Sequence, residues 1–457
     1  MPEGIGVADS TVSNRIGAPS AARDSKDCCS LDLRGEEPHA IVSRRAECPS
    51  EVRRMWLVTL VNSRTGISAR RFSVLLIVTL CAWLALASAA HAQVVSPAPA
   101  VAISEALQNR IGQVVRDAIR KHEIPGAVVA IGIRDRTVFH HAYGSLSVQP
   151  VLSVLPPDAV FDLASLTKAV ATAPSVLQLA ADRRIALDDP VARYLPAFGS
   201  KGKEAITVRQ LLTHTSGLPD DNALQDYRAG REAAVRAVFD VALRAPPGQS
   251  IRYSDVGFIV LGELVAHVSG RSLATFARER TFDPLGMSAT GFSPELAARA
   301  SCVPTTFADG AWLRGVVHDP RARAMQGEAG HAGLFSTAND LSRFARMLLG
   351  GGSLDGVRVL PPDAVSVMFT PLDEAGGERT MGLNVRRDAS AVWCGHEGFT
   401  GTALWVEPRR GVFLVVLSSR LNPDGKGNVH PTVRALRALA LEASDALGSR
   451  PIGSADR

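Results

Sequence analysis

Two β-hairpin patterns near opposite ends of the chain constrain its fold more than any other feature of the sequence. Each consists of two apolar runs separated by a short polar turn, which is typical of paired antiparallel strands. The turns are Arg134-Asp135-Arg136 and residues 407–411, and the predicted strands are 127–133, 137–143, 402–406 and 412–418. The most economical arrangement places both hairpins in one antiparallel sheet built from the two ends of the chain.

Helical patterns occupy the rest of the ordered chain. An amphipathic pattern at 103–121 precedes the first hairpin, and residues 431–446 follow the second as a helix. The clearest internal helical periods are 231–243, 257–267 and 337–349, the last with Thr337 as its N-cap. We therefore predict an α/β protein of the α+β type, in which terminal helices flank a central antiparallel sheet and a mostly helical second subdomain spans about residues 185–300.

A secretory signal peptide is predicted ahead of this unit. Arg70 and Arg71 precede an apolar run at 72–87, and Ala90-His91-Ala92 forms a small-x-small cleavage pattern. The run is short for a membrane-spanning helix, so we expect cleavage near Ala92, no stable membrane span afterwards, and a secreted or periplasmic location. Cys81 lacks the preceding small residue of a lipoprotein signal, which disfavours lipidation.

The N-terminal boundary stays open between two starts. Residues 1–54 are polar without clear periodicity, and Met55 lies just upstream of the basic region. Either Met55 is the true start and residues 1–54 are a gene-model artefact, or the chain begins at Met1 with a disordered extension. The signal peptide then spans 55–92, a Pro/Ala/Val linker spans 93–102, and residues 446–457 form a tail.

Charge and cysteine content exclude several classes of function. Residues 1–92 carry 11 Lys+Arg and 9 Asp+Glu, so cleavage leaves 365 residues and lowers the net charge from +5 to +3. That near-neutral balance, without a basic stripe, argues against a nucleic-acid partner. Only Cys302 and Cys394 remain, and the sequence does not decide whether they pair. No Cys/His spacing indicates a metal site, we expect no cofactor, and the oligomeric state stays unknown.

The first candidate for chemistry is Ser165-Leu166-Thr167-Lys168, which precedes an apolar helical pattern. A serine and a lysine three apart share one helix face, so the Lys168 amine could accept the Ser165 proton near the positive end of the helix dipole. The alternative is an ordinary serine at a helix N-terminus. Pro174 should kink this helix. A second Ser-x-x-Lys, Ser200 to Lys203, lies in a Gly/Lys-rich stretch and is interpreted as a solvated loop.

Two further segments could complete a site around this pair. In Tyr253-Ser254-Asp255 the phenol could shuttle a proton to a leaving group, although a half-buried structural tyrosine is the alternative. In residues 395–401 the glycines would let a substrate backbone approach the strand edge, and a cation or polar ring at His396 could hold a carboxylate or an acyl oxygen. A similar His331-Ala332-Gly333 leads towards a helix and is predicted to be a turn near the site.

These motifs resemble a known superfamily when taken together. Ser165-x-x-Lys168, Tyr253-x-Asp255 and His396-x-Gly398 are similar, in order and approximate spacing, to the three boxes of the serine β-lactamases and penicillin-binding proteins. The resemblance spans about residues 103–445 and looks strongest to the branch of class C β-lactamases, carboxypeptidases and esterases. Supporting stretches are 187–191, 211–218, 284–287 and 333–337. The segments 317–319 and 330–336 resemble a narrower group, the penicillin-binding protein 4B-like proteins and muramyl-peptide amidases.

The resemblance implies a β-lactamase/transpeptidase-like fold and an acyl-enzyme on Ser165, with Lys168 and Tyr253 sharing the proton transfers. It also implies an oxyanion hole formed by the backbone N–H groups of Ser165 and Phe399, and a substrate site lined by the set Asp255, His396, Gly398 and Phe399. We expect a secreted serine hydrolase of peptidoglycan-derived amides, of the muramyl-peptide amidase or D-Ala carboxypeptidase type. The alternatives are a small-ester esterase, a weak β-lactamase, or a non-catalytic penicillin or peptidoglycan binder.

Two positions depart from the family's usual boxes. Asp255 stands where asparagine is common, and a carboxylate near Lys168 favours the charged amine, which is a poorer base. We expect Tyr253 or the substrate to complete the activation. His396 and Glu397 stand where lysine and threonine are common, and a titratable ring beside a negative charge should hold a β-lactam carboxylate less firmly.

Poor β-lactamase activity is therefore expected. The measurement is the turnover of a chromogenic cephalosporin by residues 93–457, with a Ser165→Ala protein as the control. Slow or undetectable turnover fits the weak grip on the carboxylate, whereas rapid turnover that depends on Ser165 would contradict it.

Overall fold

The computed structural model describes residues 102–448 except 150, 296–297, 373–376 and 389. The described residues all belong to one compact unit, Val95–Arg457. The predicted signal peptide, the N-terminal extension and most of the predicted C-terminal tail lie outside the described residues.

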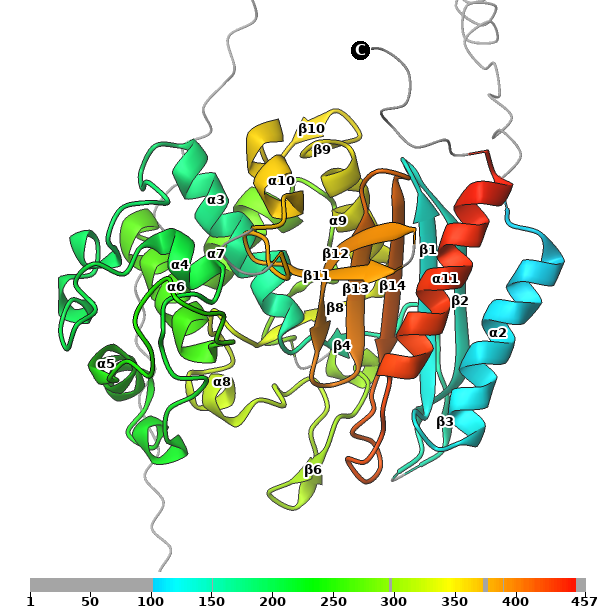
Figure 1. The fold of residues 1–457 in the computed structure, drawn as a ribbon. Coiled ribbons are helices and arrows are strands. Elements are labelled where there is room, and N and C mark those ends of the chain that lie inside the picture. The colour runs from blue at the N-terminus through cyan, green and yellow to red at the C-terminus, as the bar shows by residue number, and fades with distance from the viewer. Residues whose placement is uncertain (1–101, 150, 296–297, 373–376, 389, 449–457) are drawn as a thin grey trace, which may run out of the picture. The chain divides into compact units, whose positions relative to one another are not determined.

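A seven-stranded sheet joins the two ends of the chain, as predicted (Figure 1). Its order is β11-β12-β13-β14-β1-β2-β3, and every neighbouring pair is antiparallel. The first hairpin meets the second where β1 pairs with β14, from Ala127 opposite Ser418 to Ile133 opposite Val412. The strands are β1 Gly126–Ile133, β2 Arg136–Ser147, β3 Ser153–Val154, β11 Asn384–Asp388, β12 Ala391–Gly398, β13 Thr402–Glu407 and β14 Val412–Ser418.

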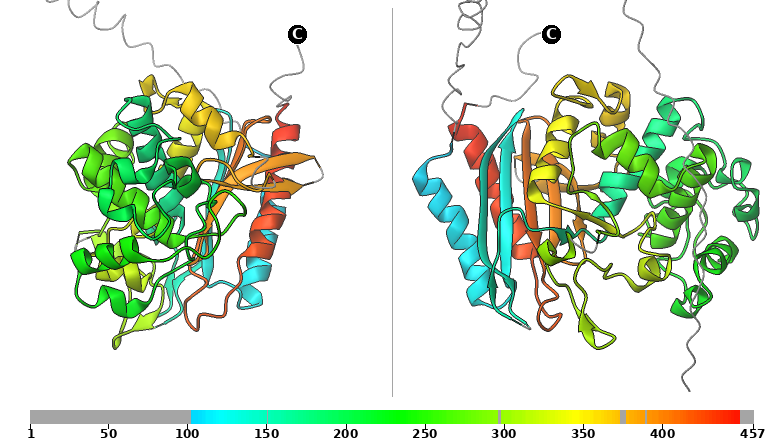
Figure 2. Two further views of the ribbon diagram at one scale, coloured as in Figure 1. Left: turned by 60° about the vertical axis from the view of Figure 1, so that its left-hand side comes forward. Right: turned by 180° about the vertical axis from the view of Figure 1, so that it is seen from behind.

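The terminal helices, α2 (Glu105–Arg120) and α11 (His430–Ala446), cover one face of this sheet (Figures 1 and 2). Both were predicted within two residues at each end. The Ser104 hydroxyl caps α2 by accepting a hydrogen bond from the Leu107 amide at 3.3 Å. Apolar side chains of both helices bury the indole rings of Trp393 and Trp405 against the sheet. This layer fixes where the N-terminal end of α11 lies relative to β12.

Helix α9 (Ala338–Leu349) packs on the opposite face against β1, β13 and β14. Thr337 caps it as predicted, because its hydroxyl accepts a hydrogen bond from the Asp340 amide at 3.2 Å. Helix α10 (Pro362–Phe369) and the short hairpin of β9 (Ser353–Leu354) and β10 (Val357–Arg358) add to the same cluster. The sheet is therefore enclosed between two helical layers.

The helical part of the molecule surrounds α6 (Asp255–Ser269), whose apolar side chains are buried on nearly every side. The other helices there are α3 Ala173–Ala181, α4 Val208–Leu212, α5 Arg231–Asp240, α7 Leu273–Ala277 and α8 Pro320–Ala324. Short 3-10 segments are 191–193, 196–198, 224–227 and 298–301, and π-helical turns are 168–172 and 278–282. Small strands complete it: β4 Phe161–Asp162, β5 Gly291–Phe292, β6 Phe307–Ala308, β7 Ala311–Trp312 and β8 Leu334–Ser336.

Over the described ranges, no single helix has the length and apolar composition to cross a membrane. One bent pair, Asp255–Ser269 with Leu273–Phe282, meets that criterion of length and composition when the two helices are taken together.

Two local predictions need correction, and a third gains detail. After Ser165 the helical segment runs without a break over 166–181, as predicted, and a π-helical turn (Lys168–Thr172) lies directly before Pro174, which has no N–H. His331-Ala332-Gly333 leads into strand β8 before the helix α9 begins. Lys203 is not solvated, because its buried ammonium donates to the Val241 carbonyl at 2.8 Å and lies 5.6 Å from the centre of the Phe198 ring.

Cys302 and Cys394, whose pairing the sequence left open, lie in different hydrophobic clusters. Cys302 is buried in the hydrophobic cluster of the helical part, and Cys394 in the cluster between the sheet and α9. They form no disulfide with each other within the described part of the chain.

Gly398, at the end of β12, lies against the segment that carries Ser165. A Cβ added to it would lie 2.3 Å from the Leu163 carbonyl oxygen and 2.2 Å from the Thr402 hydroxyl. A Cβ closer than 3.0 Å to another heavy atom would force that atom or the glycine to move, and here one of the two neighbours is the backbone oxygen of Leu163. The glycine therefore allows the sheet edge and the Ser165 turn to approach closely.

Gly398→Ala should lower the free energy of unfolding by about 1–3 kcal/mol, because the overpacked backbone must move. Denaturant unfolding measures this, with Gly291→Ala as the matched strand control, since no heavy atom lies within 4 Å of a Cβ added there. Equal stability of the two variants would show that the close approach is not a constraint.

Candidate active site

Ser165 lies in a tight turn between β4 and the π-helical turn of α3. Ala164, just before it, adopts a left-handed conformation with φ of 46°, which a residue with a side chain rarely adopts. The Asp162 carboxylate holds that turn by accepting hydrogen bonds from the amides of Ala164 at 2.9 Å and His318 at 2.7 Å. Burial raises the pKa of Asp162 to about 6 despite these bonds. The strained turn is thus fixed from both sides.

The loop after β12 is bonded directly to this turn. The Thr400 hydroxyl donates to the Asp162 carbonyl at 2.7 Å, and the Thr402 hydroxyl donates to the Leu163 carbonyl at 3.1 Å. Arg420 fixes the next residue, because its Nε donates to the Phe399 carbonyl at 2.6 Å. The predicted oxyanion-hole residues Ser165 and Phe399 therefore line one pocket of about 300 Å³.

Ser165 Oγ is the meeting point of two donors. Lys168 Nζ lies 3.1 Å away and the Tyr253 hydroxyl lies 3.0 Å away, both within hydrogen-bond distance. Side chains predicted from two separate motifs, Lys168 and Tyr253, therefore converge on the hydroxyl oxygen of Ser165. Two donors aimed at one hydroxyl oxygen are suited to stabilise negative charge that develops on it.

Lys168 is fully buried and has two hydrogen-bond acceptors and one carboxylate partner. Its ammonium contacts Ser165 Oγ, donates to the His331 carbonyl at 2.9 Å, and pairs with Asp255 Oδ1 at 2.6 Å. Burial alone would lower the pKa of Lys168, but Asp255 and Tyr253 together raise it above its usual value. The expectation that Asp255 favours the charged amine agrees with this geometry.

Tyr253 is enclosed by aromatic and cationic groups. Its ring centre lies 4.5 Å from that of His214 and 5.0 Å from Lys168 Nζ. Burial raises the pKa of its phenol, although the Lys168 charge opposes the shift. His214 accepts a hydrogen bond from the Ser254 amide at 3.0 Å, and burial holds its pKa well below the usual value. Tyr253 therefore presents a protonated hydroxyl to Ser165 in the resting site.

His396 was expected to act either as a cation or as a polar ring. It is only 3% exposed, and burial, reinforced by the Lys168 charge, lowers its pKa to about 3. It is therefore a neutral ring at physiological pH and cannot act as the cation that holds a carboxylate. Glu397 points to the opposite face of the sheet, where it contacts Trp405 Nε1 at 3.2 Å and His430 Nδ1 at 2.8 Å.

Arg379 is a site residue that the sequence did not reveal. Its guanidinium lies 5.6 Å from the centre of the Tyr253 ring and hydrogen-bonds to Asn384, which lines the Ser165 pocket. It comes from the irregular segment before β11, where no motif surrounds it. Arg379 thus supplies the positive charge beside Tyr253 that His396 does not.

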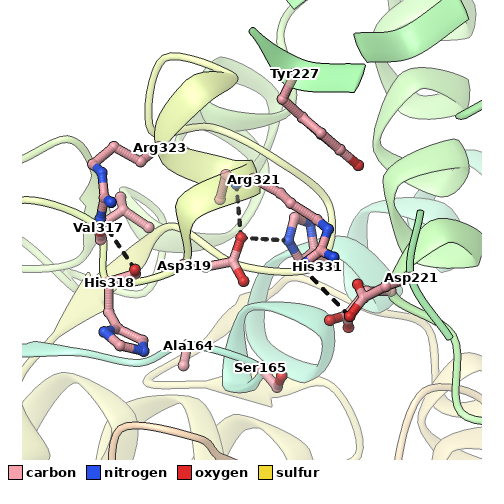
Figure 3. Close-up of polar contacts among 12 residues, drawn as sticks. Ala164, Ser165, Asp221, Tyr227, Val317, His318, Asp319, Arg321, Arg323 and His331 are labelled. Atoms are coloured by element: carbon pink, nitrogen blue, oxygen red, sulfur yellow. Dashed lines mark hydrogen bonds and ion pairs between the residues drawn. The ribbon is translucent and has the colours of Figure 1, made fainter. Parts of the chain in front are cut away.

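The segments 317–319 and 330–336 meet beside the Ser165 turn, where Figure 3 shows Asp319 pointing toward His331. Asp319 Oδ1 contacts His331 Nε2 at 3.0 Å and accepts a hydrogen bond from the Ala322 amide at 2.7 Å. Burial alone would raise the pKa of Asp319, but these partners hold it well below its usual range. The pair therefore orients the His331 carbonyl that accepts from Lys168. The motif His331-Ala332-Gly333, predicted to be a turn near the site, thus provides a backbone acceptor for the Lys168 ammonium.

Without the Asp255 carboxylate, a larger fraction of Lys168 should be the uncharged amine at neutral pH. In Asp255→Asn, burial remains while the main cause of the raised pKa is lost, so the pKa of Lys168 should fall. The measurement is the pH dependence of Ser165 labelling by a fluorophosphonate. The acidic limb should move to lower pH, and an unchanged limb, or a limb moved to higher pH, would contradict this assignment of Lys168.

Comparison with known proteins supports the same interpretation. A family model described as Beta-lactamase matches residues 111–439. The chain is 28% identical over 332 residues to a putative D-alanyl-D-alanine carboxypeptidase of Escherichia coli (strain K12), covering 63% of this chain and 76% of that protein. It is 27% identical over 358 residues to the N-acetylmuramyl-L-alanine amidase of Bacillus subtilis (strain 168), covering 67% and 80%.

The fold is also found among solved structures. The octameric penicillin-binding protein homologue from Pyrococcus abyssi superposes with a TM-score of 0.61 at 23% identity, over 75% of this chain and 78% of that chain. This likeness agrees with the predicted fold class, a large antiparallel sheet with helices on both sides. The chain therefore belongs to the β-lactamase family and is a serine hydrolase of that fold.

Proposed function

We propose that Ser165 is the nucleophile of a secreted or periplasmic hydrolase that cleaves amide bonds in peptidoglycan-derived peptides. The observation that carries the proposal is the convergence of Lys168 Nζ and the Tyr253 hydroxyl on Ser165 Oγ, at 3.1 and 3.0 Å. The relatives named as a carboxypeptidase and a muramyl-alanine amidase support the substrate class. The predicted signal peptide at 55–92 supports the location.

The proton of Ser165 needs an acceptor, and the free-amine form of Lys168 can provide one, with its nitrogen 3.1 Å from Ser165 Oγ. Asp255 pairs with the charged form, so the free amine is the minor form of Lys168 at neutral pH. That amine takes the serine proton as Oγ forms a bond to the substrate carbonyl carbon. Tyr253 then donates its proton to the leaving nitrogen as the C–N bond breaks, and regains one from the Lys168 ammonium. Water reverses the sequence and releases the acid.

The negative oxygen of the tetrahedral intermediate would be held by the backbone N–H groups of Ser165 and Phe399. Their fixed approach depends on the hydrogen bonds from Thr400 and Thr402 to the Ser165 turn. The substrate backbone would lie along β12, because β11 pairs with β12 only as far as Asn384 opposite Gly395. The unpaired edge at His396–Gly398 begins where that pairing ends and leads to the pocket of Ser165.

The neutral His396 shapes the substrate preference of this site. A buried ring without charge offers little attraction to the fixed carboxylate of a β-lactam, whereas the peptide groups of an amide substrate need hydrogen bonds rather than a cation. Small esters should also react, because an alkoxide leaves more readily than an amine. Ester hydrolysis alone therefore does not distinguish an esterase from an amidase.

Mass spectrometry of muramyl peptides incubated with residues 93–457 tests the proposal, with Ser165→Ala as the control. Release of the intact peptide from the sugar by the wild type alone identifies a muramyl-peptide amidase, and release of terminal alanine alone identifies a carboxypeptidase. No change that depends on Ser165 would refute action on these amides and leave the esterase alternative.

A further inference from the structure

A second pocket of about 400 Å³ adjoins the pocket of Ser165 on the α11 side of the sheet. Glu397 and His430 line both pockets, so the two are neighbours across these side chains. Its other charged lining residues are Arg386 of β11 and Arg434 and Arg437 of α11. We call it the arginine pocket. None of the proposed proton transfers uses any of these residues.

The positive charge of the arginine pocket is incompletely neutralised. Arg386 and Arg434 are exposed, and among the described residues no carboxylate forms an ion pair with either. Two guanidinium groups without a fixed counterion can bind an anion at little cost in broken contacts.

Arg437 adds a buried charge to the same wall. Arg437 is 6% exposed, and its guanidinium lies 5.1 Å from the centre of the Trp405 ring. Its ion pair with Asp388 is long, at 3.3 Å. Its Nε is buried without a hydrogen-bond partner. A buried cation that is only partly paired favours an additional negative charge nearby.

Glu397, the carboxylate that lines the arginine pocket, does not neutralise the excess positive charge. Both oxygens of Glu397 are occupied, one by Trp405 Nε1 at 3.2 Å and one by His430 Nδ1 at 2.8 Å. The 17-residue helix α11 begins at the pocket. Its His430 amide donates to Asn428 Oδ1 at 3.1 Å and Pro431 has no N–H, so the helix adds to the attraction for an anion through the positive end of its dipole.

We propose that the arginine pocket binds a free carboxylate of the peptide substrate, at a distance from the bond that Ser165 cleaves. This inference rests on the proposed function, because the stem peptides of peptidoglycan carry free carboxylates on their acidic residues. A peptide that follows the edge of β12 past Glu397 would bring such a group to Arg386 and Arg434. The pocket would thus select anionic peptides over neutral amides and esters.

Binding to a Ser165→Ala protein tests this without any turnover. Two ligands are compared by isothermal titration calorimetry: a muramyl tripeptide with free carboxylates and the same tripeptide with its carboxylates amidated. The variant is Arg386→Gln with Arg434→Gln, and Arg136→Gln with Arg236→Gln is a control that removes the same charge from exposed arginines elsewhere. Arg437 is left intact because it packs on Trp405.

The free tripeptide should bind the variant about tenfold more weakly or worse, as expected for lost charge-assisted hydrogen bonds, and the control pair should bind it normally. The amidated tripeptide should bind weakly to all proteins. Equal affinity of the variant and the parent for the free tripeptide, equal losses for both ligands, or no binding of either ligand would overturn the proposal. Cleavage of muramyl peptides by the Ser165 enzyme is measured separately, so the arginine pocket can fail while the proposed function stands.

Discussion

The close approach between the end of β12 and the turn that carries Ser165 is the constraint on which the rest of the site depends. Gly398 leaves no room for a side chain against the Leu163 carbonyl, and the hydroxyls of Thr400 and Thr402 bond across the gap. The sheet comes from both ends of the chain, whereas the turn leads into the helical part. Leu163 and Leu166, on either side of Ser165, lie in the same hydrophobic cluster as the sheet, and the chain enters the cluster of the helical part at Ala173.

Burial sets the protonation states around that contact in different directions. Burial and the nearby charges of Lys168 and Arg379 lower the pKa of His396 and His214 and keep both rings neutral, whereas Lys168 stays charged because Asp255 lies 2.6 Å away. The site thus holds one strong ion pair among neutral rings. The distance between Asp255 and Lys168 therefore sets how readily the Lys168 ammonium releases a proton.

The local features of the fold were predictable from sequence because they rest on short-range patterns. Both hairpins, the terminal helices and the Thr337 cap follow from periodicity and from residue types at fixed offsets. The convergence of Ser165, Lys168 and Tyr253 was expected from two motifs, Ser165-x-x-Lys168 and Tyr253-x-Asp255. The neutral state of His396, the burial of Lys203 and the position of Arg379 depend on side chains distant in sequence, so no local pattern could reveal them.

The identity of the nucleophile is the central claim, and trapping the acyl-enzyme tests it most directly. The protein is quenched during turnover of an activated ester or a muramyl peptide and then digested, and the modified residue is located by tandem mass spectrometry. The account predicts one acyl group, on the Ser165 hydroxyl, that is absent in Ser165→Ala. An acyl group on another residue, or unchanged turnover by Ser165→Ala, would contradict it.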